Sequence, residues 1–215
     1  GRLETPLILL EDIPGRSYHN GSRIVISPDN KVFLCLGDAG KKRLAQNTSV
    51  ISGKILRLNL DGSIPIDNPI KESPVYSRGH RNVQGLVMAN NILYSSEHGE
   101  ANDDELNIIK ANGNYGWPDV TGYCNEPYEI AYCKDSTIVE PIKEWTPTIA
   151  PSGIAYFGSN TIPEWTNSIL VGSLKGTSLR VLKLSSDGTK VEGESVAFNR
   201  QFGRIRDVIV APNGD

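Results

Sequence analysis

The apolar residues of this chain fall into short runs that end at turn-forming residues, and this pattern recurs along its whole length. Within the runs β-branched and aromatic side chains predominate, and the 3.6-residue spacing of an amphipathic helix is nearly absent. Gly, Asn, Asp and Pro separate the runs, as at Asp61-Gly62 and Asp187-Gly188. The pattern predicts an all-β protein with strands at residues 23–27, 31–36, 53–60, 92–95, 105–109, 168–171 and 178–184.

A weak internal repeat groups these strands into hairpins. An apolar run, a turn and a second apolar run occur at residues 24–34 and again at 86–94, and a third copy begins at Val208 and stops at its turn. Antiparallel hairpins that recur tens of residues apart are typical of β-propeller blades, whereas the strands of a β-sandwich would be more evenly spaced. At roughly 40–50 residues a blade, we expect about four blades of strand. We also expect the strand that should follow Asp215 either to lie beyond the C-terminus of a truncated chain or to be supplied from elsewhere.

Composition and charge exclude several classes of protein. The 215 residues are 38% hydrophobic and 22% charged, so the chain is neither disordered nor embedded in a membrane. No apolar run approaches the roughly 20 residues of a membrane-spanning helix. The formal net charge of -3 argues against a nucleic-acid partner, for which a basic protein is expected.

The three cysteines fall into two kinds of environment. Cys35 lies within an apolar run and is predicted to be a small buried strand residue. Cys124 and Cys133 flank a short polar loop, and their spacing suits a local disulfide, which would place the protein in an oxidising compartment. The alternative is two free thiols in a reducing compartment. No C-x-x-C motif occurs, so neither a zinc site nor a redox dithiol is expected.

Three polar segments, residues 18–23, 78–86 and 97–105, precede or follow predicted strands. In a propeller such loops gather at one end of the central channel, where ligands bind. The third segment holds five acidic residues and no Lys or Arg, which suits either a calcium site or a solvated acidic loop.

Histidine and cationic residues supply the remaining candidate chemistry. His19, in a loop near Arg23, has the ordinary pKa range of a general base, although a lone loop histidine is more often a surface residue. His80, between Gly79 and Arg81, is predicted to be structural. If the cations near glycines converge, they would form a pocket for planar carboxylates or phosphate. These cations are Arg81, Lys175, Arg204 and Arg206.

From about Ile13 to Asp215 the order of motifs resembles the soluble quinoprotein glucose and aldose sugar dehydrogenases. The sequence Glu97-His98-Gly99 places the resemblance nearest the aldose sugar dehydrogenase branch. The other motifs that carry it are His19-Asn20-Gly21-Ser22-Arg23, Gly37-Asp38, Gly53-Lys54-Ile55-Leu56-Arg57, Gly79-His80-Arg81-Asn82-Val83-Gln84-Gly85, Asp104-Glu105-Leu106-Asn107, Asn114-Tyr115-Gly116-Trp117-Pro118, Ala150-Pro151-Ser152-Gly153 and Gly203-Arg204-Ile205-Arg206-Asp207-Val208.

The resemblance implies a six-bladed β-propeller that binds pyrroloquinoline quinone (PQQ) and Ca²⁺ and oxidises the C1 hydroxyl of an aldose to the lactone. It implies that His19 is the general base and that Arg81 polarises the quinone oxygen. The other implied cofactor contacts are Asn82, His98, Lys175, Arg204 and Arg206. The implied calcium ligands are the carbonyls of Gly99 and Glu100 for a catalytic ion, and Asp104, Glu105 and the Tyr115 carbonyl for a structural one.

The chain also departs from the family pattern. Relative to the family, residues 1–215 are expected to form a single propeller domain truncated at both ends, without an upstream polar side chain that helps to bind the cofactor in relatives. Residues 123–139 are an insertion that could shape the entrance to the site. We expect an exported protein, periplasmic or extracellular, with an aldose substrate and, because no C-x-x-C-H haem motif occurs, an external electron acceptor.

Two other functions remain open. One is a propeller of the same type that binds a protein or a sugar without quinone chemistry, which would have no reason to keep His19, Arg81 and the three clamp cations together. The other is a calcium-dependent sugar lactonase, which would need acidic ligands from several blades, whereas the acids here cluster in one loop.

Overall fold

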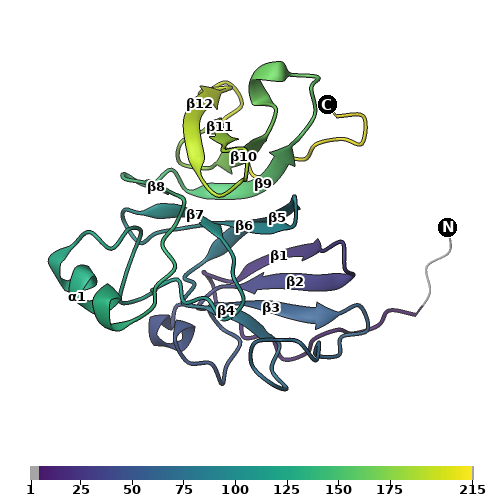
Figure 1. The fold of residues 1–215 in the computed structure, drawn as a ribbon, viewed down its shortest axis with the longest axis vertical. Coiled ribbons are helices and arrows are strands. Elements are labelled where there is room, and N and C mark those ends of the chain that lie inside the picture. Colours follow the sequence, from purple (N-terminus) through teal and green to yellow (C-terminus); the bar gives the residue numbers. More distant parts are fainter. Residues whose placement is uncertain (1–4, 215) are drawn as a thin grey trace.

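A computed structural model describes residues 5–214 of the chain and shows twelve β-strands in three four-stranded antiparallel sheets (Figure 1). The first sheet holds β1 (Gly21–Ile26), β2 (Lys31–Leu36), β3 (Lys54–Asn59) and β4 (Val75–Arg78), in that order. The second holds β5 (Val83–Ala89), β6 (Ile92–Glu97), β7 (Asp104–Ile108) and β8 (Lys143–Trp145). The third holds β9 (Pro151–Phe157), β10 (Ser168–Ser173), β11 (Ser178–Leu184) and β12 (Val191–Ala197).

Each sheet is a meander of successive strands, as the hairpin repeat predicted. The seven predicted strands are all present, shifted at their ends by a few residues at most. The first strands of the three sheets, β1, β5 and β9, lie next to one another, so the sheets are arranged as consecutive blades around a common axis. The all-β propeller architecture is therefore confirmed.

The number of blades differs from the prediction of about four. The part of the chain that the structure describes forms three sheets, because long connections take up the remaining length. Residues 60–74 and 109–142 link strands within the first and second sheets, and residues 198–214 contain no strand. Val208 and Val210, where a strand was predicted, instead pack against the face of the third sheet that carries Leu170 and Val181.

The core lies between the sheets, where apolar faces meet. Phe33, Cys35 and Ile55 of the first sheet pack against Val83 and Leu86 of the second. A second cluster joins Tyr94 and Leu106 to Ile154, Ile169 and Leu182 of the third sheet. Because the middle strands are covered on both faces, β2 and β10 are buried along nearly their whole length. Cys35 is fully buried, as predicted.

The loop between Cys124 and Cys133 contains α1 (Pro127–Asp135), where a polar loop was predicted. A proline in the first turn and a reciprocal capping box between Glu126 and Glu129 start this helix. It presents no clear apolar face, so the sequence pattern carried no helix signal. Short 3-10 turns at η1 (Lys42–Ala45) and η2 (Pro163–Trp165) complete the regular structure.

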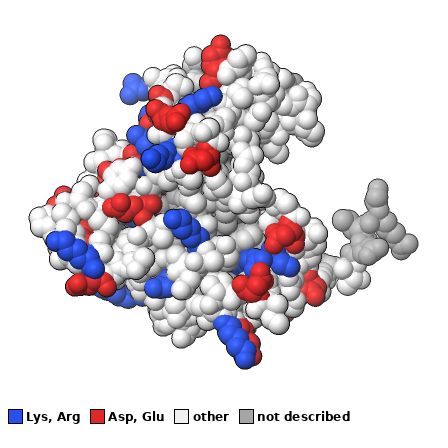
Figure 2. All heavy atoms as spheres, in the orientation of Figure 1, with Lys and Arg blue, Asp and Glu red and all other residues white. Residues whose placement is uncertain are grey.

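A disulfide joins Cys124 to Cys133 across this helix, with their Cα atoms 6.5 Å apart, so the predicted bridge is confirmed. Within residues 5–214 we find no helix with the length and apolar character needed to cross a membrane. Lys, Arg, Asp and Glu are interspersed on the face in Figure 2, where no single-sign patch dominates.

Candidate functional site

His19 lies just before β1, at the end of the inner strands where the polar loops meet. Its Nδ1 atom lies 2.8 Å from Oδ1 of Asp38, and its carbonyl accepts a hydrogen bond from the backbone N–H of Ala39. The side chain of His19 is 18% exposed, and Nε2 has no hydrogen-bond partner among the described residues. The Asp38 carboxylate thus fixes the imidazole with Nδ1 as donor and leaves Nε2 free to accept a proton.

The backbone around His19 needs a glycine opposite it. His19 has a φ of 57°, in the left-handed region that few residues other than glycine adopt. A Cβ atom at Gly37 would overlap the carbonyl oxygen of His19. The Gly37-Asp38 pair therefore has two tasks, since the glycine admits the histidine loop and the aspartate orients its ring.

Asp38 is buried and accepts three hydrogen bonds. In addition to His19, the backbone N–H of Gly40 donates to it over 2.7 Å and Nε1 of Trp117 over 2.9 Å. Burial alone would raise the pKa of Asp38, but the hydrogen bonds from His19, Gly40 and Trp117 together lower it below the ordinary value. The carboxylate stays ionised beside the imidazole.

Arg81 lies over the ring of the same Trp117. Its guanidinium carbon is 5.3 Å from the ring centroid, and Nη1 donates to the carbonyl of His98 over 3.3 Å. The Nε atom of Arg81 is buried and has no hydrogen-bond partner in the part of the chain that the structure describes. Because buried donors in native proteins are nearly always paired, this atom indicates a missing acceptor.

Glu97 fixes the backbone that carries Arg81. Its Oε1 accepts hydrogen bonds from the N–H groups of Arg81 and Asn82, and its Oε2 pairs with Nδ1 of His80 at 2.9 Å. His80 is fully buried and stacks on the ring of Tyr115. His80 is therefore structural, as predicted.

Asn82 and His98 are tied to the surrounding backbone. The Oδ1 atom of Asn82 accepts from the N–H of Gly21 and from the side chain of Gln84. His98 donates from Nε2 to the carbonyl of Pro151 over 2.7 Å, and burial lowers its pKa, so the ring stays neutral. The first and second sheets and the start of the third thus meet at this site.

Sequence reasoning assigned no role to Asp38, Trp117 or Glu97, although each holds an assigned residue in place. All three stand within motifs that carry the family resemblance, and Glu97 also opens the acidic segment. For Asp38 and Trp117 the available signal was the polar or indole side chain directly after a glycine, whereas nothing set Glu97 apart from the other acids of its segment. The contacts of these residues with the assigned ones span 15 to 79 positions of the chain.

The remaining predicted cations lie on the third sheet and the segment after it. The Nζ atom of Lys175 donates to Thr148 over 2.8 Å, and the side chains of Lys175, Arg204 and Arg206 are exposed. None of the three forms an ion pair within the described residues. The carbonyl of Arg206 accepts hydrogen bonds from Gly153 of β9 and from Arg23 of β1. The structure therefore brings the Arg206 backbone to the inner strands, but among the described residues no hydrogen bond joins these three side chains to His19 or Arg81.

The predicted calcium ligands surround the start of β7. Asp104 is buried and accepts hydrogen bonds from the N–H groups of Gly99, Ile149 and Ala150, and burial raises its pKa. Glu100 is exposed. In residues 5–214 no group of three or more His, Cys, Asp or Glu side chains is arranged to hold a metal.

Glu105, the second predicted carboxylate ligand, is also buried. It accepts from the N–H of Gly122 and from the amide of Asn107. Burial, followed by the charge of Glu97, raises the pKa of Glu105 to about 8. The hydroxyl of Tyr115 donates to the carbonyl of Ile108. The Tyr115 side chain is thus engaged in the fold, while the predicted ligand is its carbonyl.

The fold and this site define a class: a β-propeller with a carboxylate-oriented histidine and a stacked arginine at one end of its inner strands. The sequence profile of the family described as "Glucose / Sorbosone dehydrogenase" matches residues 1–215, so the chain belongs to this family.

Individual relatives agree with the family match. The chain is 32% identical to quinoprotein glucose dehydrogenase B of Acinetobacter calcoaceticus, over 99% of this chain and 61% of that protein. It is 34% identical to the aldose sugar dehydrogenase of Escherichia coli, over 91% of this chain and 55% of that protein. The solved PQQ-bound aldose sugar dehydrogenase of Streptomyces coelicolor matches with a TM-score of 0.79 and 36% identity, over 92% of this chain and 54% of that chain. The chain thus spans between half and two thirds of the length of these relatives.

Proposed function

We propose that the protein is a PQQ-dependent aldose sugar dehydrogenase that oxidises the C1 hydroxyl of an aldose to the lactone. The observation that carries the proposal is that an oriented base, His19, lies near a cation, Arg81, that has a buried N–H group without a hydrogen-bond acceptor. Nδ1 of His19 is held by Asp38, and Trp117 joins this pair to Arg81, whose buried Nε lacks an acceptor. The family membership and the names of the relatives support the same reaction class.

The residues present fit PQQ, a planar quinone with three carboxylates. Arg81 offers a buried N–H without a partner, and it lies beside the flat face of Trp117. Lys175, Arg204 and Arg206 have no carboxylate partners among the described residues, and we propose that they bind the carboxylates of the cofactor. Asn82 and His98 would border it. When bound, PQQ supplies the acceptor for the hydride from C1 of the sugar.

His19 performs the proton transfer in this proposal. Its Nε2 takes the proton of the C1 hydroxyl as the C1–H bond breaks, and the Asp38 carboxylate stabilises the imidazolium that forms. Arg81 places positive charge where the quinone oxygen becomes negative. The product is the lactone, and an external electron acceptor reoxidises the cofactor.

Calcium is part of the proposal, with the carbonyls of Gly99 and Glu100 as ligands of a catalytic ion that acts as a Lewis acid. Asp104, Glu105 and the Tyr115 carbonyl would hold a second, structural ion. Two observations support a cation near Glu105: its pKa is raised by burial, and Oδ1 of the neighbouring Asn107 is buried without a partner. A rise in melting temperature with CaCl2 in wild type, and its loss in Glu105→Gln, tests the second site.

We also propose that the protein is exported and that the complete domain is longer than residues 1–215. The disulfide supports an oxidising compartment, periplasmic or extracellular. A six-bladed propeller for the whole protein, of which residues 1–215 are one part, is supported by the greater length of the relatives.

Arg81→Met tests the cofactor site directly. The affinity for PQQ, measured by the quenching of tryptophan fluorescence as PQQ is added, should fall by about tenfold or more in this variant, since a charge-assisted contact is lost. Unchanged quenching would remove Arg81 from the site.

A further inference from the structure

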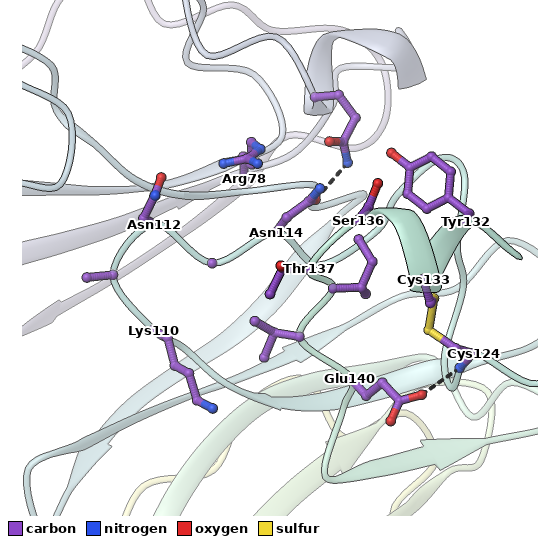
Figure 3. Close-up of a pocket in the computed structure, with 15 residues that line it drawn as sticks. Arg78, Lys110, Asn112, Asn114, Cys124, Tyr132, Cys133, Ser136, Thr137 and Glu140 are labelled. Carbon is purple, nitrogen blue, oxygen red and sulfur yellow. Dashed lines mark hydrogen bonds between the residues drawn. A yellow bond between two sulfur atoms is a disulfide. The ribbon is translucent and has the colours of Figure 1, made fainter. Parts of the chain in front are cut away.

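A large open pocket lies outside the site described above, beside the disulfide (Figure 3). It has a volume of about 1100 Å³, at the upper end of ordinary ligand pockets. One wall comes from the end of β4 and the turn after β7, with Arg78, Lys110 and Asn112. The facing wall is the end of α1 and the segment that follows it. No residue of the His19–Asp38–Arg81 site lines this pocket.

The two cations of the pocket are unpaired. Neither the guanidinium of Arg78 nor the ammonium of Lys110 forms a hydrogen bond or an ion pair within residues 5–214. The carboxylate that lines the pocket is that of Glu140, and its Oε1 accepts from the N–H of Cys124 over 2.8 Å. Two unpaired cations on one wall favour a ligand that carries an acidic group.

Neutral polar groups cover much of the remaining surface. Ser136 and Thr137 present hydroxyls. The side-chain oxygen of buried Asn114 accepts a hydrogen bond from the amide of Gln46, while the side-chain nitrogen of Asn114 has no partner among the described residues. Such groups exchange hydrogen bonds with the hydroxyls of a ligand, because each can donate or accept. The ring of Tyr132 lines the same pocket as an aromatic surface with a polar tip.

The geometry points to a second binding site for an oligosaccharide that carries acidic groups. Its acidic groups pair with Arg78 and Lys110, one sugar ring packs its C–H face on Tyr132, and its hydroxyls bond to Glu140 and the neutral groups. The volume is that of a pocket for a ligand of many atoms, whereas a single inorganic anion would leave most of it empty. This inference does not depend on the proposed dehydrogenase function.

The disulfide gives the pocket a rigid wall. Cys124 and Cys133 both line it, and their bridge holds the end of α1 against the segment that carries Glu140. A fixed wall lowers the entropy lost when a ligand binds, since the loop is ordered beforehand. The insertion of residues 123–139 thus forms part of this pocket.

Isothermal titration calorimetry tests the inference with three probes: trigalacturonate, neutral maltotriose and inorganic phosphate. We expect trigalacturonate to bind and the other two to bind at least about tenfold more weakly. Arg78→Gln/Lys110→Gln should weaken trigalacturonate binding by at least about tenfold. The matched control Lys71→Gln/Arg200→Gln removes the same charge at exposed positions outside the pocket and should change affinity by less than about twofold.

Several results would overturn the inference. The first is that trigalacturonate does not bind, and the second is that its affinity falls equally in the control variant. The third is that phosphate binds as tightly as trigalacturonate, which would indicate an adventitious ion only. Tyr132→Ala supplies an independent measurement, because it should lower the affinity for trigalacturonate but leave the weak phosphate binding unchanged. Far-UV circular dichroism establishes that each variant is folded before it is titrated.

Discussion

Nδ1 of His19 and Oδ1 of Asp38 lie 2.8 Å apart, although 19 positions separate the two residues in the chain. The N–H of Asp38 also donates to the carbonyl of Arg81 over 2.9 Å. The aspartate therefore connects the proposed base to the proposed electrophilic cation through both its side chain and its backbone. This link makes Asp38 a positioning residue, which acts through His19.

Replacing Asp38 distinguishes a role in orienting His19 from a role in binding the cofactor. Asp38→Asn keeps the shape but removes the charge that stabilises the imidazolium, so we expect kcat to fall by about 10²- to 10⁴-fold with little change in PQQ affinity. The pH dependence of kcat should also change, which a purely structural effect would not cause. Asp135→Asn, which removes the same charge at an exposed position at the end of α1, is the control. Wild-type kcat in Asp38→Asn would exclude this role.

Gly37→Ala tests the close approach of the histidine loop. The added methyl group would overlap the His19 carbonyl, so the loop must move, with a loss of about 1–3 kcal/mol of stability and most of the activity. Gly193→Ala in the edge strand β12 is the matched control, since its Cβ would meet only Lys183 at 4.0 Å. Chemical denaturation of both variants measures the difference. Equal stabilities would show that the loop adapts without cost.

The strands and the blade architecture could be predicted from the sequence because they depend on local signals. Alternating apolar residues and turn residues such as Pro28-Asp29-Asn30 define the hairpin of β1 and β2 without knowledge of distant contacts. The number of blades could not be predicted in the same way. Long connections, such as residues 109–142, contain apolar residues but add no strand to a sheet, and their contact with β4 is an isolated bridge between Asn114 and Arg78.

The site was predictable in part. The motif residues His19 and Arg81 were identified, but the network that joins them depends on Trp117, which lies 79 positions from Asp38. Such a contact is set by the packing of blades and leaves no periodic signal in the sequence. The convergence of Lys175, Arg204 and Arg206 depends in the same way on tertiary arrangement, and it stays a prediction.

The cysteines should react differently with thiol reagents. Burial raises the pKa of Cys35 to about 12, so its thiol should stay unmodified in the folded protein and react only after unfolding. Cys124→Ser/Cys133→Ser should lose about 2–3 kcal/mol of stability, the loop-closure value for a loop of this size. Mass spectrometry after alkylation and urea denaturation measure the two effects. Two further reactive thiols in unreduced protein would contradict the disulfide.

Lys54 should give the stability a distinct pH dependence. It is fully buried, and its Nζ donates to the carbonyls of Leu44 and Ser52. Burial, followed by the charge of Arg78, lowers the pKa of Lys54 from 10.5 to about 7. Between these two values the unfolded chain binds a proton that the folded chain lacks, so stability rises with pH, by at most about 1.4 kcal/mol per pH unit.

Lys54→Met removes this contribution. We expect the variant to be less stable overall, because two carbonyls lose a donor, but its free energy of unfolding should rise less steeply between pH 7.5 and 9.5, a range chosen to lie within about pH 7–10.5. Lys71→Met, at an exposed position, should keep the wild-type slope. Parallel slopes for wild type and Lys54→Met would show that Lys54 stays charged in the folded protein.

The central claim is that His19 takes the proton of an aldose whose hydride passes to PQQ. The most direct measurement is the absorbance of protein-bound PQQ, with Ca²⁺ present, as aldoses such as glucose, galactose and xylose are added to wild type and to His19→Gln. We predict that sugar bleaches the oxidised quinone in wild type, and that His19→Gln binds PQQ equally well but is not bleached. Bound quinone that no aldose reduces in wild type, or equal bleaching in His19→Gln, would contradict the account.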